Sequence, residues 1–280
     1  MKLKEVQDKL YDLLCLVDDI CRKENIPYFL DGGTELGAVR DKDIIPWDDD
    51  MDIKIHMKDY PAFKAAMQKH LPEHIHLVEP DAFAPGFYDF LLRIQDDRYL
   101  IREEKEEDRY YKNLQNRISI DLCFLFGIPS GKISQKLAYY RLLFIYGLGM
   151  GHRYKNDYSD KSFAEKIGVM FFSTIGKLIP VQVIWKHFYR VIDKMDKRCN
   201  GYVWCNLLNK ESIIKKEWMM GTIDGELRGR KFPVPSGYDS ELKAYYGDYM
   251  TPPKDISSFR QHLDEEDRYI FNNEERKNQQ

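Results

Sequence analysis

The chain has 280 residues, of which 43% are hydrophobic and 14% aromatic, and its 43 basic and 46 acidic side chains give a formal charge of -3. This length and composition can fill a sizeable core, so they exclude a disordered chain, a fibrous protein and a small disulfide-stapled scaffold. The near balance of charge creates no global field for a polyanion, so we expect no nucleic acid partner.

The first predicted element is an amphipathic helix over residues 3–25, because apolar residues recur there at helical spacing. Charged residues interrupt its apolar positions, so the segment does not resemble a signal peptide. The five cysteines contain no CxxC pair, which argues against a disulfide framework and against a zinc site. These features together favour a cytoplasmic protein.

A short strand at residues 28–30 leads into a glycine turn, and a helix is predicted over residues 35–40. The following strand, at residues 51–57, is apolar at odd positions and carries Asp52 and His56 among its even ones. This period of two predicts one buried face and one face free for chemistry.

Strands dominate the next part of the chain, after a helix over residues 59–70 that begins at an Asp and a Pro. Branched and aromatic runs predict strands over residues 75–78, 90–94 and 118–126. The charge run at residues 102–109 predicts a solvated helix or loop.

From residue 130 the pattern changes to long helices, which we predict over residues 134–150, 162–179 and 181–199. From Gly221 the chain returns to short segments with four prolines, which predict irregular structure that packs back on the body. We therefore expect an α+β fold with a mixed sheet core, divided into residues 1–129, 130–220 and 221–280.

One apolar stretch, residues 167–185, has the length of a membrane span but contains Lys177 and Pro180. These interruptions argue against a true span. A buried helix and an interfacial amphipathic segment both stay open, and nearby Lys161, Lys166 and Lys186 favour the second. We expect either core packing or peripheral membrane contact here.

The densest chemical signal lies between residues 30 and 55, where two glycines precede a cluster of carboxylates. Gly32 and Gly33 let the backbone approach a phosphate and point its N–H groups inward, and the start of the following helix favours an anion. A strand, two glycines and a helix are weak evidence when they stand alone.

Asp50 and Asp52 are two residues apart at the start of a strand, so their side chains project to the same face and can share a divalent cation. Such a pair suits Mg²⁺, with Mn²⁺ as a substitute. Asp48 and Asp49 add charge that a metal or a cationic partner must compensate. The alternative is a solvated acidic turn.

Asp121 is a lone acid in an apolar strand, and it shares a face with Ser119. Because a buried unpaired carboxylate is costly, a third carboxylate here suggests a two-metal site. The alternative is a strand-end acid that accepts hydrogen bonds from backbone amides.

Together these motifs resemble a known family. A glycine pair, an Asp-x-Asp strand and a single acid in a later strand resemble the nucleotidyltransferase fold. The strings GGTELGAVRDKDIIPWDDDMDI, SIDLCFLFGIP and PVPSGYDSELKAYYGDYMTPP occur in this order and resemble the LicD family of phosphotransferases. The resemblance covers about residues 28–262 and is weakest in the helical middle. It implies a nucleotidyltransferase-like mixed sheet core flanked by helices, followed by a mainly helical region that binds the acceptor or lies near a membrane.

The LicD resemblance implies transfer of a substituted phosphate, typically phosphocholine from CDP-choline, to a sugar hydroxyl of a cell-surface glycan precursor, with CMP leaving. Teichoic acid, capsule and lipid-linked saccharides are acceptors of this kind, and such an enzyme works in the cytoplasm or at the inner face of the plasma membrane. Fukutin and fukutin-related protein are similar in transferring ribitol phosphate from CDP-ribitol. Nucleotidyl transfer with release of pyrophosphate stays open as the alternative.

By position, the family's metal-binding pair, phosphate turn and third acid correspond to Asp50 and Asp52, to Gly32, Gly33 and Thr34, and to Asp121. Asp121 is our candidate to hold a second metal or to take the proton of the acceptor.

Several neighbouring residues are secondary candidates. Arg40 is expected to pair either with a diphosphate or with the carboxylates of Asp48 and Asp49. Trp47 is expected to pack rather than to stack on a base. The remaining candidates are Asp31 before the glycines, Tyr246 and Asp248 in a turn that could close the site, and His262, which either reaches a substrate phosphate or is a surface residue.

Overall fold

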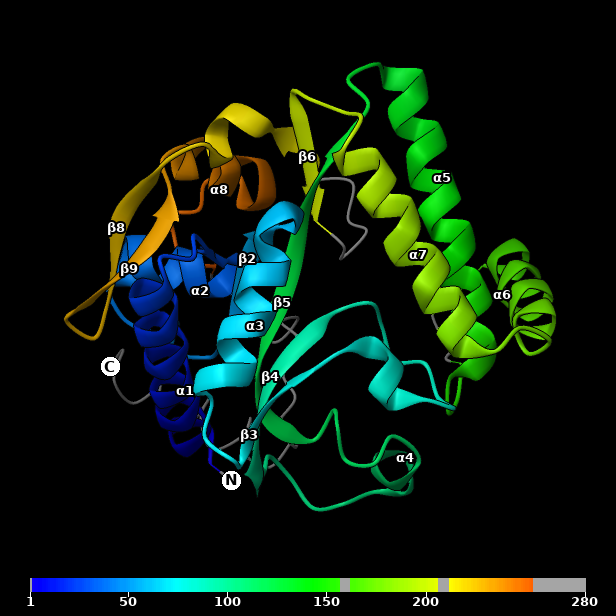
Figure 1. Cartoon of the computed structure of the whole chain (residues 1–280), viewed down its shortest axis with the longest axis horizontal. Helices are drawn as coiled ribbons and strands as arrows, with labels where there is room; N and C mark the ends of the chain where they lie inside the picture. The colour runs from blue at the N-terminus through cyan, green and yellow to red at the C-terminus, as the bar shows by residue number, and fades with distance from the viewer. Residues whose placement is uncertain (1, 157–161, 206–211, 254–280) are drawn as a thin grey trace.

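The computed structural model describes residues 2–156, 162–205 and 212–253. A mixed sheet with strand order β1-β2-β5-β4-β3 forms its centre, in which β2 and β5 are parallel and the other neighbours antiparallel (Figure 1). β6 pairs with β5, and β7 with β6. The strands of this sheet are β1 (Phe29–Asp31), β2 (Asp52–His56), β3 (Ile75–Val78), β4 (Leu92–Leu100), β5 (Arg117–Ile128), β6 (Tyr202–Cys205) and β7 (Ile214–Lys215).

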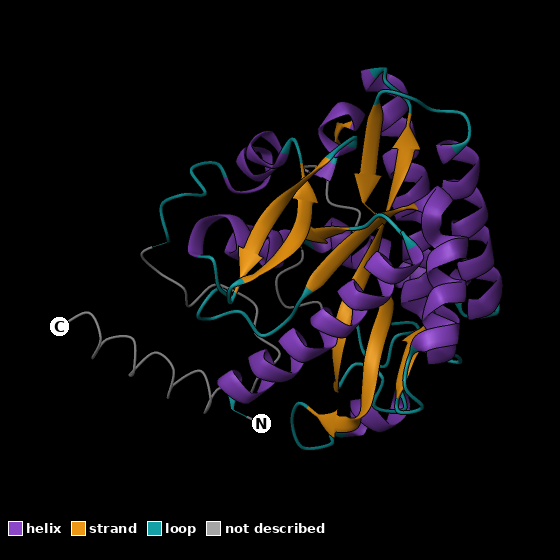
Figure 2. Ribbon diagram, turned by 60° about the vertical axis from the view of Figure 1, so that its left-hand side comes forward, coloured by secondary structure: helices purple, strands orange, loops and turns teal. Residues whose placement is uncertain are grey.

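Helices cover both faces of the sheet (Figure 2). On one face α1, α3 and α7 join the apolar strand residues in one buried core, whereas α2 and α8 pack over the other face. The α-helices of the described residues are α1 (Leu3–Glu24), α2 (Gly32–Leu36), α3 (Tyr60–His70), α4 (Glu106–Tyr110), α5 (Lys132–Gly149), α6 (Phe163–Gly176), α7 (Val181–Asp196) and α8 (Tyr238–Tyr246).

The expected α+β class and mixed sheet are confirmed, and most elements lie close to their predicted bounds. The helix predicted over residues 35–40 begins earlier, because α2 starts at the glycine pair and continues as a π-helical turn, Gly37–Asp41. β6 and β7, which follow the long helices in the chain, complete the sheet that the N-terminal part begins.

The prediction of a solvated segment at residues 102–109 is wrong for Asp108. This carboxylate is fully buried and forms a two-pronged ion pair with the Arg102 guanidinium. It also accepts hydrogen bonds from the Lys105 backbone N–H, at 2.8 Å, and from the Gln115 side chain, at 2.7 Å. Because these donors satisfy the charge, one acid of the run can leave solvent.

The prediction of irregular C-terminal structure is also wrong. The chain there forms a hairpin of β8 (Thr222–Leu227) and β9 (Arg230–Pro235), which α8 follows. Arg228 and Gly229 have φ angles of 50° and 78°, as a two-residue type I′ turn requires. The prolines fit β9 because each strand of a two-stranded ribbon has an outer edge.

Among the described residues, none of the helices taken singly has both the length and the apolar character of a membrane span. The segments Glu165–Gly176 and Val181–Asp196 reach that length and character only as a pair, which bends by 107°.

Candidate active site

Three aspartates lie side by side on one face of the sheet. Asp31 in β1 is in register with Asp52 in β2, and Asp52 is in register with Asp121 in β5. Side chains at paired positions of neighbouring strands point to the same face. Arg93 in β4 continues the row, because it is in register with Asp121. The fold thus brings Asp52 and Asp121 together and places Asp31 beside them.

The glycine turn leads from β1 into α2 and lies against these carboxylates. Gly32 has a φ of +53°, which favours glycine, and an added Cβ would lie 3.3 Å from Asp52 Oδ2. A Cβ at Gly33 would overlap the Asp48 carboxylate. Thr34 Oγ1 accepts a hydrogen bond of 2.9 Å from the Asp52 backbone N–H. The turn is therefore held directly against the start of β2.

Helix α1 fixes the acidic loop that precedes β2. The Gln7 side-chain amide donates hydrogen bonds to the backbone carbonyls of Asp48, at 2.8 Å, and of Ile45, at 3.2 Å. Because both acceptors are backbone atoms, Gln7 fixes the loop without using the Asp48 carboxylate.

Asp50 lies where two cavities meet. Together with Asp48 and Asp52 it lines a cavity of about 400 Å³, which we call the carboxylate cavity. On its other side it lines a narrow cavity with Asp121 and the buried Asp49. The carboxylate cavity has the size of a small-molecule site.

Crowding shifts the ionisation of these carboxylates. Burial, with Asp50 and Asp121 nearby, raises the pKa of Asp52 well above its usual range. Burial and the Asp50 carboxylate likewise raise the pKa of Asp48. When they ionise together these groups repel one another, and a divalent cation would compensate that repulsion. Since hard carboxylate oxygens are ligands that Mg²⁺ prefers, the donor set fits this ion.

The turn after α8 forms another wall of the carboxylate cavity, which Tyr246, Asp248 and Tyr249 line. An added Cβ at Gly32 would lie 3.8 Å from the Tyr246 hydroxyl, so this tyrosine stands over the glycine turn. Trp47 lines the same cavity and packs against the apolar cluster that contains Tyr249. The expected packing role of Trp47 fits this position.

Arg40 lines the carboxylate cavity. Its expected pairing with a diphosphate stays a prediction, and the ion pair that the structure shows differs from the one expected with Asp48 or Asp49. Its guanidinium pairs with Asp41, at 2.7 Å, and donates to the Tyr249 backbone carbonyl, at 3.2 Å. The adjacent Asp41, rather than Asp48 or Asp49, takes this role because it follows Arg40 directly in the chain. His262 lies outside the described residues.

Sequence reasoning missed a buried ionic cluster beneath the glycine turn. Lys54 of β2 is fully buried, and its ammonium lies 3.1 Å from Asp31, 2.7 Å from Glu35 and 2.5 Å from Glu241. Burial opposes its charge, but the three carboxylates raise the pKa of Lys54 well above its usual range. The cluster ties β1, β2, α2 and α8 together at the cavity.

The alternation of β2 predicts the wrong environment for Lys54. A lysine at an even position of this strand suggests a solvent-exposed side chain, whereas Lys54 is buried. The three acids lie within 4.8 Å of one another, a grouping that could also hold a metal. The Lys54 ammonium already supplies the positive charge there.

Arg93 is a second residue that the sequence did not single out. It is buried in β4 and lies 3.2 Å from the Asp121 carboxylate and 2.6 Å from that of Asp89. Its role depends on the pairing of β4 with β5, and a single sequence contains no signal of that register.

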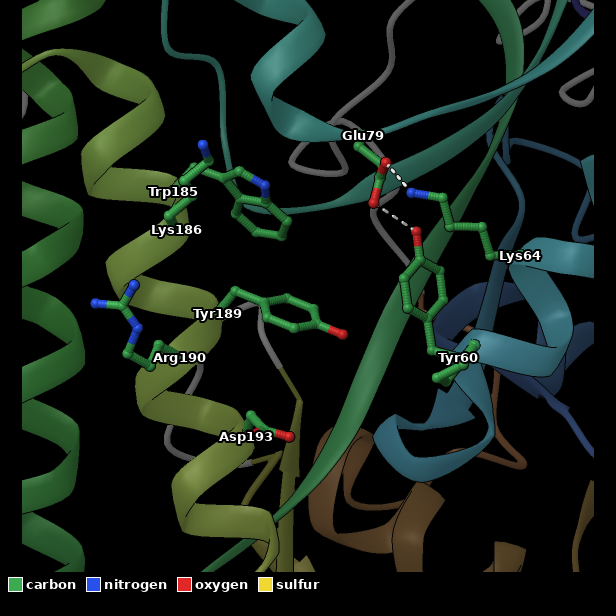
Figure 3. Close-up of a pocket in the computed structure, with 9 residues that line it drawn as sticks. Tyr60, Lys64, Glu79, Trp185, Lys186, Tyr189, Arg190 and Asp193 are labelled. Atoms are coloured by element: carbon green, nitrogen blue, oxygen red, sulfur yellow. Dashed lines mark hydrogen bonds and ion pairs between the residues drawn. The ribbon is translucent and has the colours of Figure 1, made fainter.

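Another cavity, of about 550 Å³, lies between α3 and α7 (Figure 3). Tyr60 and Tyr189 line it, and both rings contact Phe124 of β5. Phe124 is three residues after Asp121 in the same strand, so it points to the opposite face of the sheet. Tyr60 and Lys64 both donate to the Glu79 carboxylate at its edge. This cavity is therefore separate from the carboxylate cavity.

Comparison with known proteins finds a family model that matches part of the chain. Residues 25–124 match the family model described as LicD/FKTN/FKRP, nucleotidyltransferase domain. The chain contains a LicD-family domain. This LicD domain includes the glycine turn and the aspartates Asp31, Asp50, Asp52 and Asp121, whereas the wall that α8 provides lies beyond the matched residues.

Relatives extend the similarity beyond the LicD domain. The chain is 26% identical over 271 residues to the lipopolysaccharide cholinephosphotransferase LicD of Haemophilus influenzae, which covers 95% of this chain and 97% of that protein. It is also 33% identical to an uncharacterized protein of Rickettsia prowazekii over 101 residues, which are 36% of each chain. An uncharacterized protein of Rickettsia typhi is 48% identical over 50 residues, which are 18% of this chain and 16% of that protein.

Proposed function

We propose that this protein is a LicD-type phosphotransferase that moves a substituted phosphate from a CDP-alcohol to a sugar hydroxyl of a cell-surface glycan precursor. The observation that carries the proposal is the row Asp31, Asp52 and Asp121 beside a glycine turn, within a LicD domain. Similarity to a lipopolysaccharide cholinephosphotransferase over 95% of the chain favours phosphocholine as the group and a glycan as the acceptor. Teichoic acid and capsule precursors belong to the same acceptor class.

We propose a nucleotidyltransferase-like core that binds Mg²⁺, with Mn²⁺ as a substitute. Asp50 and Asp52 would hold the ion, since both line the carboxylate cavity and their neighbours crowd it with negative charge. The chemistry that the ion supplies when bound is neutralisation of the diphosphate. Gly32, Gly33 and Thr34 would bind the phosphates.

In the proposed reaction the sugar oxygen forms a bond to the phosphorus that carries choline. The bond from that phosphorus to the bridging oxygen breaks, and CMP leaves with this oxygen. Asp121 would either receive the proton that the sugar hydroxyl loses or hold a second metal ion. Arg93, 3.2 Å from Asp121, orients that carboxylate in both cases.

The proposed location follows from the proposed acceptor. We propose that the enzyme works in the cytoplasm, in peripheral contact with the inner face of the plasma membrane, where a lipid-linked acceptor would be within reach.

Titration calorimetry of the full chain tests the donor. CDP, CDP-choline, CDP-glycerol, CDP-ribitol and the four nucleoside triphosphates would each be titrated with and without Mg²⁺. We expect Mg²⁺-dependent binding with a preference for one CDP-alcohol, and CMP as the product in a turnover assay. Selective binding of a triphosphate, with release of pyrophosphate, would overturn the proposal in favour of nucleotidyl transfer.

A further inference from the structure

Helices α5 and α6 expose a surface of large apolar side chains at the edge of the molecule. Figure 1 shows α6 at the right-hand edge, beyond α5 and α7 as seen from the sheet. The exposed residues of α5 recur at intervals of three and four, so they share one face of the helix. We define the apolar surface as Ile133, Leu137, Tyr140 and Phe144 of α5, Phe163, Ile167, Met170 and Phe171 of α6, and Leu178 after it.

These side chains project far from the protein. Ile133 is 80% exposed, Phe163 79% and Leu178 82%, which is unusual for residues of this size. Single exposed apolar residues need no explanation, but a contiguous group on two adjacent helices marks an interaction site.

An apolar cavity of about 650 Å³ opens between the two helices. Phe144 and Phe172 meet in it edge to face, with ring centroids 5.2 Å apart. Arg153 also lines the cavity, and its Nε is buried without a hydrogen-bond partner among the described residues. The cavity therefore has a mainly apolar lining, with one cation, Arg153, and one acid, Glu165, in its wall.

The two interpretations of residues 167–185 apply to different halves of that stretch. After Pro180, α7 buries Ile184, Trp185 and Phe188 in the core. Before Pro180, α6 keeps Ile167 and Met170 exposed. Core packing thus accounts for α7 and leaves the apolar face of α6 in need of another partner.

The charge around the apolar surface indicates what that partner is. Residues 131–153 and 162–180 contain one acid, Glu165, and six basic residues: Lys132, Lys136, Arg141, Arg153, Lys166 and Lys177. The chain as a whole has a charge of -3, so this positive excess is local. A second copy docked on the same face would bring like charges together, whereas an anionic surface complements them.

We propose that the apolar surface docks the protein on an anionic phospholipid membrane. The apolar side chains would insert among the acyl chains, with the basic residues at the headgroup phosphates, as in interfacial helices. The cavity between α5 and α6 would accept an acyl chain. This surface would make the membrane contact proposed above, and its biological purpose rests on the proposed function. The contact itself requires no substrate, so it can be tested separately.

Co-sedimentation of the full chain with vesicles tests this proposal. One set of vesicles contains phosphatidylcholine alone, and the other adds phosphatidylglycerol. We expect at least about tenfold tighter binding to the anionic vesicles, and loss of that preference in Lys132→Glu/Lys136→Glu, because each basic residue contributes about fivefold. Leu137→Ser/Phe163→Ser should weaken binding to the anionic vesicles at least about tenfold.

Matched controls keep the test specific. Ile223 is an exposed apolar residue on β8 and Lys23 an exposed lysine on α1, so Ile223→Ser and Lys23→Glu should bind like the original chain. The proposal would be overturned if the control substitutions lowered vesicle binding as much as the surface substitutions do. It would also be overturned if the protein stayed in the supernatant with both kinds of vesicle. A dimer in light scattering that Leu137→Ser/Phe163→Ser dissociates without lipid would overturn it as well. Unchanged turnover of a soluble acceptor by the surface variants would show that the proposed function stands independently.

Discussion

At Asp52 the proposed activity and the stability of the fold make opposite demands, because metal binding needs the charged carboxylate and burial disfavours it. We expect Asp52→Asn to lower turnover at least about a thousandfold, because the proposed divalent metal would lose a ligand. Its raised pKa means that the fold disfavours the charged form, so the metal-free variant should unfold at equal or higher urea concentration. Asp50→Asn should lose turnover in the same way.

Asp12 provides the control for that pair, since it is exposed on α1. Asp12→Asn should retain both turnover and the unfolding midpoint. Near-normal turnover in Asp52→Asn or Asp50→Asn would remove the basis for placing the metal in the carboxylate cavity.

Glu35 makes stability depend on pH. Burial, opposed by Lys54 and reinforced by Glu241, raises the pKa of Glu35 from 4.5 to about 8. Between these values the folded state binds more protons than the unfolded state, so stability falls as the pH rises through that window. Glu35→Gln removes this titration while keeping an acceptor for Lys54.

The prediction is therefore that Glu35→Gln loses less stability than the original chain between about pH 5 and about pH 8, by an amount on the order of a few kcal/mol. Urea unfolding at several pH values measures this difference. Parallel stability curves for the two proteins across the window would show that Glu35 ionises normally.

These residues also show which parts of the site can be predicted from a sequence. The position of Asp52 can, because the alternation of β2 places it on the face opposite the apolar residues. Asp50 lies in the loop before β2, and it is the path of that loop that brings it to the same cavity. The ion pair between Lys54 and Glu241 cannot be predicted in this way. Glu241 is 187 residues away, and only the packing of α8 brings it to β2.

At the scale of elements, the glycine turn between β1 and α2 is the most constrained connection at the cavity. Gly33→Ala would force a Cβ into the Asp48 carboxylate, so the turn or the acidic loop must move. We expect a loss of about 1–3 kcal/mol in the free energy of unfolding. Turnover should fall about a hundredfold, because positioning errors near 1 Å have that effect.

Gly168 in α6 is the matched control for this substitution, because a Cβ there would meet nothing within 4 Å. Gly168→Ala should raise stability by up to about 1 kcal/mol through helix propensity and leave turnover of a soluble acceptor unchanged. Equal effects of the two substitutions on turnover would contradict a special role for the turn.

The elements that the sequence predicted well are those with a long local pattern. α1 and α3 follow from helical spacing and β3 from a bounded apolar run, and all three lie almost where they were expected. The β8–β9 hairpin did not follow, because its prolines indicated loop and its turn contains Arg228-Gly229 in place of the usual Asn-Gly. Only the finished ribbon shows that the prolines lie where a ladder tolerates them.

At the scale of the whole molecule, our proposals place the active site at one end of the fold and the membrane contact at the other. Figure 1 shows α2, α8 and the β8–β9 hairpin on one side and α5 and α6 on the other. The carboxylate cavity is lined from the first side and the apolar surface belongs to the second. The sheet lies between them.

This separation limits the acceptor. A chain docked through α5 and α6 holds its carboxylate cavity away from the bilayer, so a sugar attached directly to a membrane lipid could not reach it. On vesicles we expect CMP release with acceptors that carry several sugars and little with a single-sugar lipid, whereas both should react in detergent. Equal rates on vesicles would contradict either the docking face or the site. If the difference is found, the thickness of this domain sets the shortest glycan chain that the enzyme can modify at a membrane.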